Sequence, residues 1–171
     1  MNIIKNTLRI SILVTALTVL MSNSLFGAYS PQLYITNTNS NNISVYNTID
    51  MTHVSGSPFA SGRSPIAAVV NPLANRLYIA NYGDNTISVY DTSSMTQISG
   101  SPFPAGNGPR AMALDILRNL LYIVNLTENN LRVYDTNTML EISDSPFTTG
   151  SGPTALVLDY VTKRLYIANN I

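Results

Sequence analysis

The sequence predicts an all-β chain in which one structural unit is repeated. The segment Leu33-Tyr34-Ile35-Thr36-Asn37 returns in closely related form at residues 77, 121 and 165, each time after a step of 44 residues without a gap. A Val-Tyr pair, a Ser-Pro-Phe triplet and a Gly-x-x-Pro segment keep the same spacing. Each full unit holds four short strand patterns, and four antiparallel strands in roughly 40–50 residues form one blade of a β-propeller. We therefore predict a partial β-propeller of about three four-stranded antiparallel blades plus an incomplete one.

The four strands of a unit follow a regular order. The first is a continuous apolar run, such as residues 111–114, as expected for a strand buried on both faces. After a turn and the Leu-Tyr-Ile strand, a polar loop leads to the alternating strand at residues 87–90. Gly83 and Asn85 in that loop can take the positive φ of a tight hairpin. A weaker fourth strand is expected near residues 95–98, and the Ser-Pro-Phe segment after it should end the sheet, because proline cannot donate to a ladder.

The composition excludes several classes of function. Of the 171 residues, 45% are hydrophobic and 11% are charged, and the formal net charge is zero. This charge balance gives no electrostatic basis for binding nucleic acid. The chain has no cysteine, which rules out disulfides and an acylated lipoprotein anchor. We expect no cofactor.

Residues 1–28 form a separate N-terminal region with the pattern of a signal peptide. Two basic residues precede an uncharged run over residues 10–21, and small and polar residues follow. This order of basic, apolar and small residues marks a chain for export. We predict a signal helix that is cleaved after Ser24 or Ala28. The alternative is an uncleaved membrane anchor, although the apolar run is shorter than the roughly 20 residues that span a bilayer. The predicted location is therefore extracytoplasmic: periplasmic, secreted or at the cell surface.

The remaining residues 29–171 carry the repeat units, which begin near Leu33, Leu77, Leu121 and Leu165. The first unit begins at its second strand, and the fourth covers only two strands. Closed propellers have roughly four to eight blades, so these units do not close a ring by themselves. Three explanations stay open: the sequence is a fragment of a longer propeller, two copies complete a ring by self-association, or the chain forms an open arc.

Three stretches of the sequence resemble a known family. They are Leu-Tyr-Ile-Ala-Asn from residue 77, Asp-Asn-Thr-Ile-Ser-Val-Tyr-Asp-Thr from residue 84 and Gly-Asn-Gly-Pro-Arg-Ala-Met-Ala-Leu-Asp from residue 106. They are similar to YVTN-type β-propeller repeats, which occur in surface-layer proteins and in the lactonase-like seven-bladed propeller superfamily. The resemblance covers about residues 31–171. It implies a propeller fold and either a binding or a hydrolytic function, since such propellers host both.

Polar residues that differ between units are better candidates for function than residues that recur in every unit. In a propeller, the loops between second and third strands share one face with the segments that lead into the innermost strands. On that loop face we expect five unit-specific residues: Arg63, Asp84, Asn107, Arg110 and Glu128. Converging acidic and basic groups there could hold an anionic or carbonyl-bearing ligand, with arginine giving bidentate contacts. The alternative is ordinary solvated loop charge.

The sequence does not predict a catalytic or metal site. His53, the single histidine, falls on the predicted outermost strand, and no second histidine or cysteine could join it as a metal ligand. A serine near the axis would lack its usual general base. The lactonase-like relatives act through His, Arg and Glu residues in a central cleft, and of these the chain offers only Arg110 and Glu128 there.

Two hypotheses about function follow. The first is a non-catalytic binding or surface-structural module that binds a protein or a small molecule. The second is a lactonase-like hydrolase of a small lactone or sugar acid, which rests on the resemblance together with Arg63, Arg110 and Glu128. The sequence favours the first hypothesis, because residues for a complete hydrolytic site are missing from the region around the predicted axis.

Overall fold

The computed structural model describes residues 31–170, and regular structure within this range consists of β-strands alone. The predicted signal helix at residues 1–28 lies outside the described residues. No segment of the described range is a helix with the length and apolar character needed to cross a membrane. The strands in chain order are β1 (Gln32–Asn37), β2 (Asn42–Asn47), β3 (Phe59–Ala60), β4 (Pro65–Asn71), β5 (Arg76–Asn81), β6 (Thr86–Asp91), β7 (Thr96–Gln97), β8 (Phe103–Pro104), β9 (Pro109–Asp115), β10 (Leu120–Asn125), β11 (Asn130–Asp135), β12 (Phe147–Thr148), β13 (Pro153–Asp159) and β14 (Arg164–Asn169).

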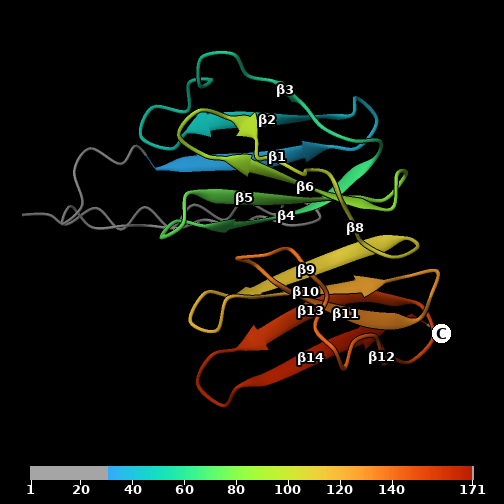
Figure 1. The fold of residues 1–171 in the computed structure, drawn as a ribbon. Helices are drawn as coiled ribbons and strands as arrows, with labels where there is room; N and C mark the ends of the chain where they lie inside the picture. The colour runs from blue at the N-terminus through green and yellow to red at the C-terminus, as the bar shows by residue number, and fades with distance from the viewer. Residues whose placement is uncertain (1–30, 171) are drawn as a thin grey trace, which may run out of the picture.

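These strands form four antiparallel sheets, one for each repeat unit. The first blade has the order β1-β2-β3, the second β4-β5-β6-β7 with β8 also on β6, the third β9-β10-β11-β12, and the fourth is the hairpin β13-β14. The sheets lie side by side, with the first and fourth blades at opposite ends of the row (Figure 1). Strand β4 neighbours β1 and β9, and β13 neighbours β9. The all-β fold with a partial propeller architecture is therefore confirmed.

Each blade has two apolar faces because side chains alternate along its strands. In the second blade, Leu77 and Ile79 pack with Ile43 and other residues of the first blade, and we call this side the leading face. Tyr78 and its neighbours on the opposite side pack with Leu121 and other residues of the third blade, and we call this side the trailing face. Each trailing face therefore contacts the leading face of the following blade. Fully burying one such side chain contributes roughly 1.5–3 kcal/mol, so these inter-blade layers are the core of the molecule.

Tight hairpin turns connect the strands, as the loop composition predicts. Asn85, in the loop between β5 and β6, has a φ of 59°. Asn75, in the turn between β4 and β5, has a φ of 52°. Gly83 does not take a positive φ. Of the two loop residues that were predicted to be able to adopt it, Gly83 and Asn85, only Asn85 does so. Asparagine tolerates the left-handed region better than most residues, which explains its recurrence at these turns.

The outer strand of each full unit is split in two, which corrects the prediction that Ser-Pro-Phe ends the sheet. In the second blade, β7 pairs with residues 90 and 91 of β6, and β8 then pairs with residues 86 and 87. Between them, the Ser101 hydroxyl oxygen accepts a hydrogen bond of 2.9 Å from the Val89 amide. A side chain thus supplies the acceptor where the Ser-Pro segment leaves the ladder. Ser57 and Ser145 do the same for Val45 and Val133.

Each innermost strand carries a β-bulge near its start. In β4, Pro65 pairs with Asn81 and Ala67 pairs with Ala80, so Ile66 is an extra residue. The extra residue is Arg110 in β9 and Thr154 in β13. Bulges redirect a side chain away from the regular alternation of a strand. The same backbone irregularity therefore presents a different side chain in each blade.

Candidate functional site

The loop face brings two of the predicted site residues, Arg63 and Asp84, into direct contact. Arg63 lies in the connection that leads into β4, and Asp84 lies in the hairpin loop between β5 and β6. The Arg63 Nε donates to Asp84 Oδ1 at 2.6 Å, and the Arg63 backbone amide donates to Asp84 Oδ2, also at 2.6 Å. The guanidinium Nη2 also donates to the Gly83 carbonyl at 2.8 Å. Both carboxylate oxygens of Asp84 are therefore used to fix the connection onto the hairpin.

The charge of Asp84 is stabilised by these contacts. Hydrogen bonds from the side chain and backbone of Arg63 hold the pKa of Asp84 below its ordinary value. Arg63 nevertheless keeps 72% of its side chain exposed, against 33% for Asp84. Because solvent screens such a pair, its net contribution to stability is small. The pair orders the loop face but leaves part of the guanidinium accessible to a ligand.

Glu128 takes part in a second polar cluster, in the third blade. Its carboxylate accepts hydrogen bonds from Asn130 Nδ2 at 3.0 Å and from Arg132 Nη2 at 3.2 Å. Partial burial opposes its ionisation, but the hydrogen bonds from Asn130, the Asn107 amide and Arg132 outweigh burial, so the pKa of Glu128 is lowered. Asn107 and Glu128 are thus brought together, through the backbone of Asn107. Arg132 also binds Glu141 at 2.8 Å, which makes Glu128 part of an ion-pair network.

Arg110 stands apart from the other four predicted residues. It occupies the bulge at the start of β9 and is partly exposed. Within residues 31–170, its guanidinium forms no ion pair or side-chain hydrogen bond, and Glu128 binds Arg132 instead. The predicted residues therefore group as Arg63 with Asp84 and Asn107 with Glu128. Arg110 is the member of the set whose charge is not engaged by the described part of the chain.

Arg132 and Glu141 belong to the same polar cluster as Glu128 but were not among the residues predicted from the sequence. The sequence does mark both residues as specific to one unit. Arg132 stands where the other units have Ser44 and Ser88, and Glu141 stands where the second unit has Gln97. The position of Glu141 contacts the serine of the Ser-Pro-Phe segment in each unit, with Ser145 donating to Glu141 Oε1 at 2.5 Å. Arg132 thus links the loop face to the outer strand of the third blade.

The strand-end asparagines are buried beneath the same loops. Asn81 and Asn125 are fully buried, and each has a side-chain oxygen without a hydrogen-bond partner among the described residues. Asn81 Nδ2 donates to Ser88 at 2.9 Å. A Cβ atom on Gly106 would lie 2.6 Å from Asn125 Nδ2, so glycine lets the connection approach the strand end closely. These asparagines support the loop face from below.

His53 lies where the sequence places it, at the outer edge and away from the loop face. It is exposed and forms an isolated bridge with Tyr46, and the two ring centroids are 4.2 Å apart. Its Nδ1 is 3.2 Å from the Ser57 hydroxyl. No group of three or more His, Cys, Asp or Glu side chains in residues 31–170 is arranged to hold a metal ion. His53 therefore acts in packing the outer strand.

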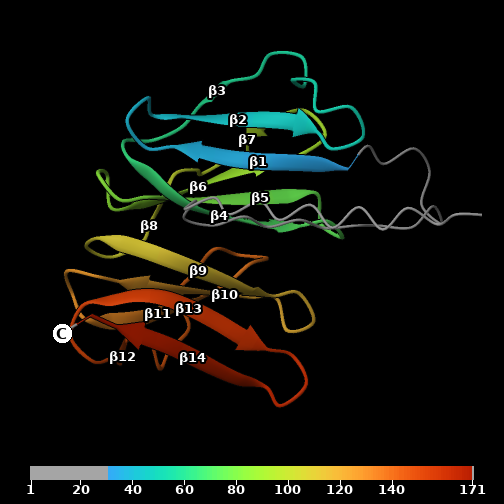
Figure 2. The same cartoon turned by 180° about the vertical axis from the view of Figure 1, so that it is seen from behind.

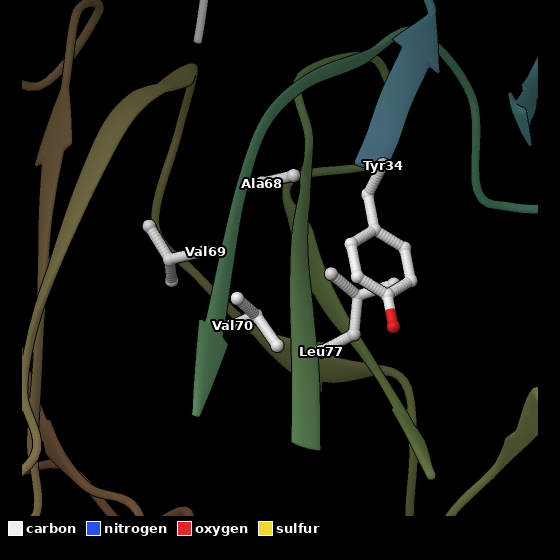
Figure 3. A pocket seen from close by; sticks show the side chains of 5 residues that line it. All are labelled: Tyr34, Ala68, Val69, Val70 and Leu77. Carbon is white, nitrogen blue, oxygen red and sulfur yellow. The ribbon is translucent and has the colours of Figure 1, made fainter. Parts of the chain in front are cut away.

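Two hollows lie away from the loop face. The first is shallow and apolar, and Figure 3 shows the Tyr34 ring beside Leu77 and Val70 there. The Tyr34 hydroxyl donates to Gln32 at 2.7 Å, so its polar group is already used. The second hollow, of about 350 Å³, lies between the second and third blades and includes Arg76. Arg76 pairs with Asp91 at 2.8 Å. Neither hollow includes the predicted site residues.

Comparison with known proteins defines the fold but not a family. No known protein-family model matches the chain, and no curated protein matches it. Among solved structures, hydrazine synthase from Kuenenia stuttgartiensis resembles it with a TM-score of 0.73 and 20% identity, over 81% of this chain and 39% of that chain. A functionally unknown protein from Desulfotomaculum acetoxidans resembles it with a TM-score of 0.69 and 15% identity, over 81% of this chain and 45% of that chain.

Both solved structures are all-β propeller-like folds, and this chain is a β-propeller-like repeat protein. The chain spans less than half the length of either neighbour. At such low identity the likeness concerns the fold alone.

Proposed function

We propose that this chain is an exported, YVTN-type β-propeller repeat protein that acts as a non-catalytic binding or surface-structural module. The observation that carries the proposal is the pairing of the charged loop-face residues with one another. Asp84 holds Arg63, and Glu128 holds Arg132, so both carboxylates fasten neighbouring segments together. A general base for hydrolysis needs a carboxylate or imidazole that is available to a substrate or a water molecule. The pairing therefore favours binding over hydrolysis.

Arg110 is the residue that we assign to ligand contact. Its position in the bulge of β9 is specific to the third blade, since the equivalent residues are Ile66 and Thr154. An arginine that has no partner among residues 31–170 can give bidentate hydrogen bonds to a carboxylate or phosphate of a ligand. The ligand class is therefore an anionic small molecule or an acidic segment of an envelope protein.

Export and envelope association can be tested together. We expect N-terminal sequencing of the cellular protein to begin after Ser24 or Ala28, as the signal pattern requires. We also expect the wild-type protein to fractionate with the cell envelope and Arg110→Ala to shift to the soluble fraction. Arg118→Ala is the matched control, because Arg118 lies beyond the other end of β9 and pairs with Asp115. Wild-type protein that is freely soluble and outside the envelope fraction would refute the proposal.

A lactonase-like hydrolase of a small lactone or sugar acid is the second candidate. It is favoured by the presence of Arg110 and Glu128 in the same blade, on segments that both belong to the loop face. If this candidate is right, the purified protein hydrolyses a lactone, and the rate falls at least about tenfold in Arg110→Ala and in Glu128→Ala. A fall of this size is expected when a group that stabilises charge in the transition state is lost. Hydrolysis that is absent, or unchanged in both variants, excludes this site assignment.

A further inference from the structure

The hollow between the second and third blades is a candidate binding site away from the loop face. Its volume of about 350 Å³ falls within the range of roughly 300–1,000 Å³ that is usual for small-molecule sites. Arg76 of its lining lies at the start of β5, and residues 136–139 follow the end of β11. The loop face lies at the opposite ends of these two strands. Both views show the second and third sheets as neighbours in the middle of the row (Figure 1, Figure 2).

One wall of this hollow is apolar and is held in place by the core. Ile98, Phe103 and Met139 line it. Met139 belongs to the core layer between the two blades, and Ile98 and Phe103 pack against that layer. Phe103 is nevertheless only partly buried. Small-molecule sites combine such an aromatic and aliphatic wall with a few polar groups that fix the orientation of the ligand.

Polar groups with unused hydrogen-bonding capacity border the apolar wall. Ser99 of the second blade and Asn137 of the third line the hollow, and both are exposed. Neither side chain has a hydrogen-bond partner within residues 31–170. Arg76 Nη1 donates to Asp91 at 2.8 Å and to the Asn75 carbonyl at 3.1 Å, but Nε and Nη2 donate to none of the described residues. The hollow therefore offers a hydroxyl, an amide and two guanidinium N–H groups to a ligand.

The charges around the hollow do not favour an anion. Arg76 is the charged residue of its lining, and Asp91 already pairs with this guanidinium. A second carboxylate, Asp135, accepts hydrogen bonds from the amides of Asn137 at 2.8 Å and Thr138 at 3.1 Å, in the turn that lines the hollow. Two carboxylates thus accompany one guanidinium. An anionic ligand would meet no net attraction from these groups, so the polar groups suit a neutral ligand.

Two of the polar groups are specific to this junction between blades. Asn137 stands where the first and second units have Ile49 and Ser93. Arg76 stands where the first unit has Gln32. The corresponding junction between the first and second blades would therefore offer Gln32 and Ser93 instead of an arginine and an asparagine. Polar residues that differ between units are better candidates for function than those that recur, and this holds for Arg76 and Asn137.

We propose that this hollow binds one ring of a neutral sugar. The faces of a sugar ring carry C–H groups, which Phe103 would cover. The ring edge carries hydroxyls, which both donate and accept and so match Ser99, Asn137 and Arg76 without adding charge. The guanidinium Nε and Nη2 form a fork that can bind two adjacent hydroxyls. This site goes beyond the proposed binding function and does not depend on the loop face.

The binding is measured by NMR titration of the full chain labelled with ¹⁵N. The neutral probes are methyl glucoside, methyl galactoside and N-acetylglucosamine, and the charged probe is glucuronate. We expect at least one neutral sugar to shift the amide signals of Ser99, Phe103 and Asn137 with a Kd of roughly 1–10 mM, as for a ligand of few atoms. Glucuronate should bind roughly fivefold more weakly than that sugar. The proposal is overturned if no neutral sugar shifts these signals, or if glucuronate binds more tightly.

Single substitutions test whether the hollow itself is the site. Ser99→Ala and Asn137→Ala should each weaken sugar binding roughly three- to tenfold, because each removes one hydrogen-bonding group. Both residues are exposed, so the variants should keep the amide spectrum of the folded protein. Ser143→Ala is the matched control, since Ser143 is the equivalent of Ser99 in the third unit and lies outside this hollow. Unchanged binding in either test variant, or weakened binding in Ser143→Ala, would overturn the assignment.

Discussion

Arg63 and Asp84 are 21 residues apart in sequence, and two hydrogen bonds of 2.6 Å join them across the loop face. The same connection is held from its other side, because the Ser64 amide donates to Asn41 Oδ1 of the first blade at 2.8 Å. One connection is therefore fastened to the hairpin loops of two successive blades. The Gly108 amide repeats the second contact with Asn85 at 2.9 Å. Polar contacts on the loop face thus keep consecutive blades in register.

Replacing Asp84 should change how stability depends on pH. Arg63 lowers the folded-state pKa of Asp84, so the carboxylate contributes stability above its ordinary pKa of about 4 and loses it as the pH falls through the lower folded value. Asp84→Asn should therefore lower stability at pH 7 by less than about 1 kcal/mol, as for an exposed pair. The variant should also have a flatter stability curve below about pH 4.

Urea unfolding from neutral to acidic pH measures this difference. Asp144→Asn is the control, because Asp144 is an exposed carboxylate in the third unit. Substitution of this surface carboxylate should change stability at pH 7 by less than about 0.5 kcal/mol. Equal slopes for wild type and Asp84→Asn would show that the Arg63 contact does not persist in solution.

Removing the hydroxyl of Ser101 should destabilise the second blade. Ser101→Ala leaves the amide of Val89, a residue 1% exposed, without its 2.9 Å acceptor. An unpaired buried amide costs roughly 1–3 kcal/mol. Ser99→Ala, two residues earlier on the exposed side, should change stability by less than about 0.5 kcal/mol. Unfolding midpoints in urea compare the two variants, and equal effects would show that the hydroxyl is not a ladder acceptor.

Gly106 should tolerate alanine less well than Gly100 does. Both residues have a positive φ, 87° and 83°, so alanine meets the same backbone cost of roughly 1–2 kcal/mol at each. Only at Gly106 would the new Cβ lie 2.6 Å from Asn125, which is fully buried and cannot move aside. Overpacking of this kind costs roughly 1–3 kcal/mol more. Thermal unfolding of both variants tests the difference, and similar midpoints would mean that the connection relaxes away from the strand end.

Tyr134 should make the protein sensitive to alkaline pH. Burial, together with the charge of Glu141, raises the pKa of Tyr134 to about 12. The contribution of Tyr134 to the free energy of unfolding is fully present below the ordinary tyrosine pKa of about 10. It is lost as the pH rises toward about 12, with a slope of up to about 1.4 kcal/mol per pH unit. Tyr134→Phe should remove that part of the slope. Tyr82→Phe, an exposed tyrosine, should retain it, and the reverse ranking in alkaline urea titrations would contradict the assignment.

The positions of the strands could be predicted from the sequence because the repeat fixes them four times over. The apolar run at 111–114 lies inside β9, and the strand expected at 87–90 lies inside β6. The split of the outer strand could not be predicted, since it depends on Ser101 replacing a backbone acceptor across the sheet. The serine recurs in each Ser-Pro-Phe triplet, but its recurrence does not show that its hydroxyl accepts from a backbone amide.

The loop face could be predicted in outline, but its pairing could not. Propeller topology places Arg63 beside Asp84 once the strands are assigned. The partner of Glu128 is Arg132, which projects from β11 and looks in sequence like a strand residue. The bulge at Arg110 and the close approach of Gly106 to Arg132 and Glu128 are backbone features of the folded sheet, and the repeat pattern does not reveal them.

The division of the outer strand also affects how the blade rims behave toward other molecules. An uninterrupted edge strand presents a row of free amides and carbonyls on which a foreign strand can extend the sheet. Here the rim of the second blade consists of two pieces, β7 and β8, of two residues each, with a proline between them. Such a rim cannot template fibril growth along its length. A repetitive, charge-poor β-protein is thereby protected from lateral aggregation at the edge where it would otherwise be most vulnerable.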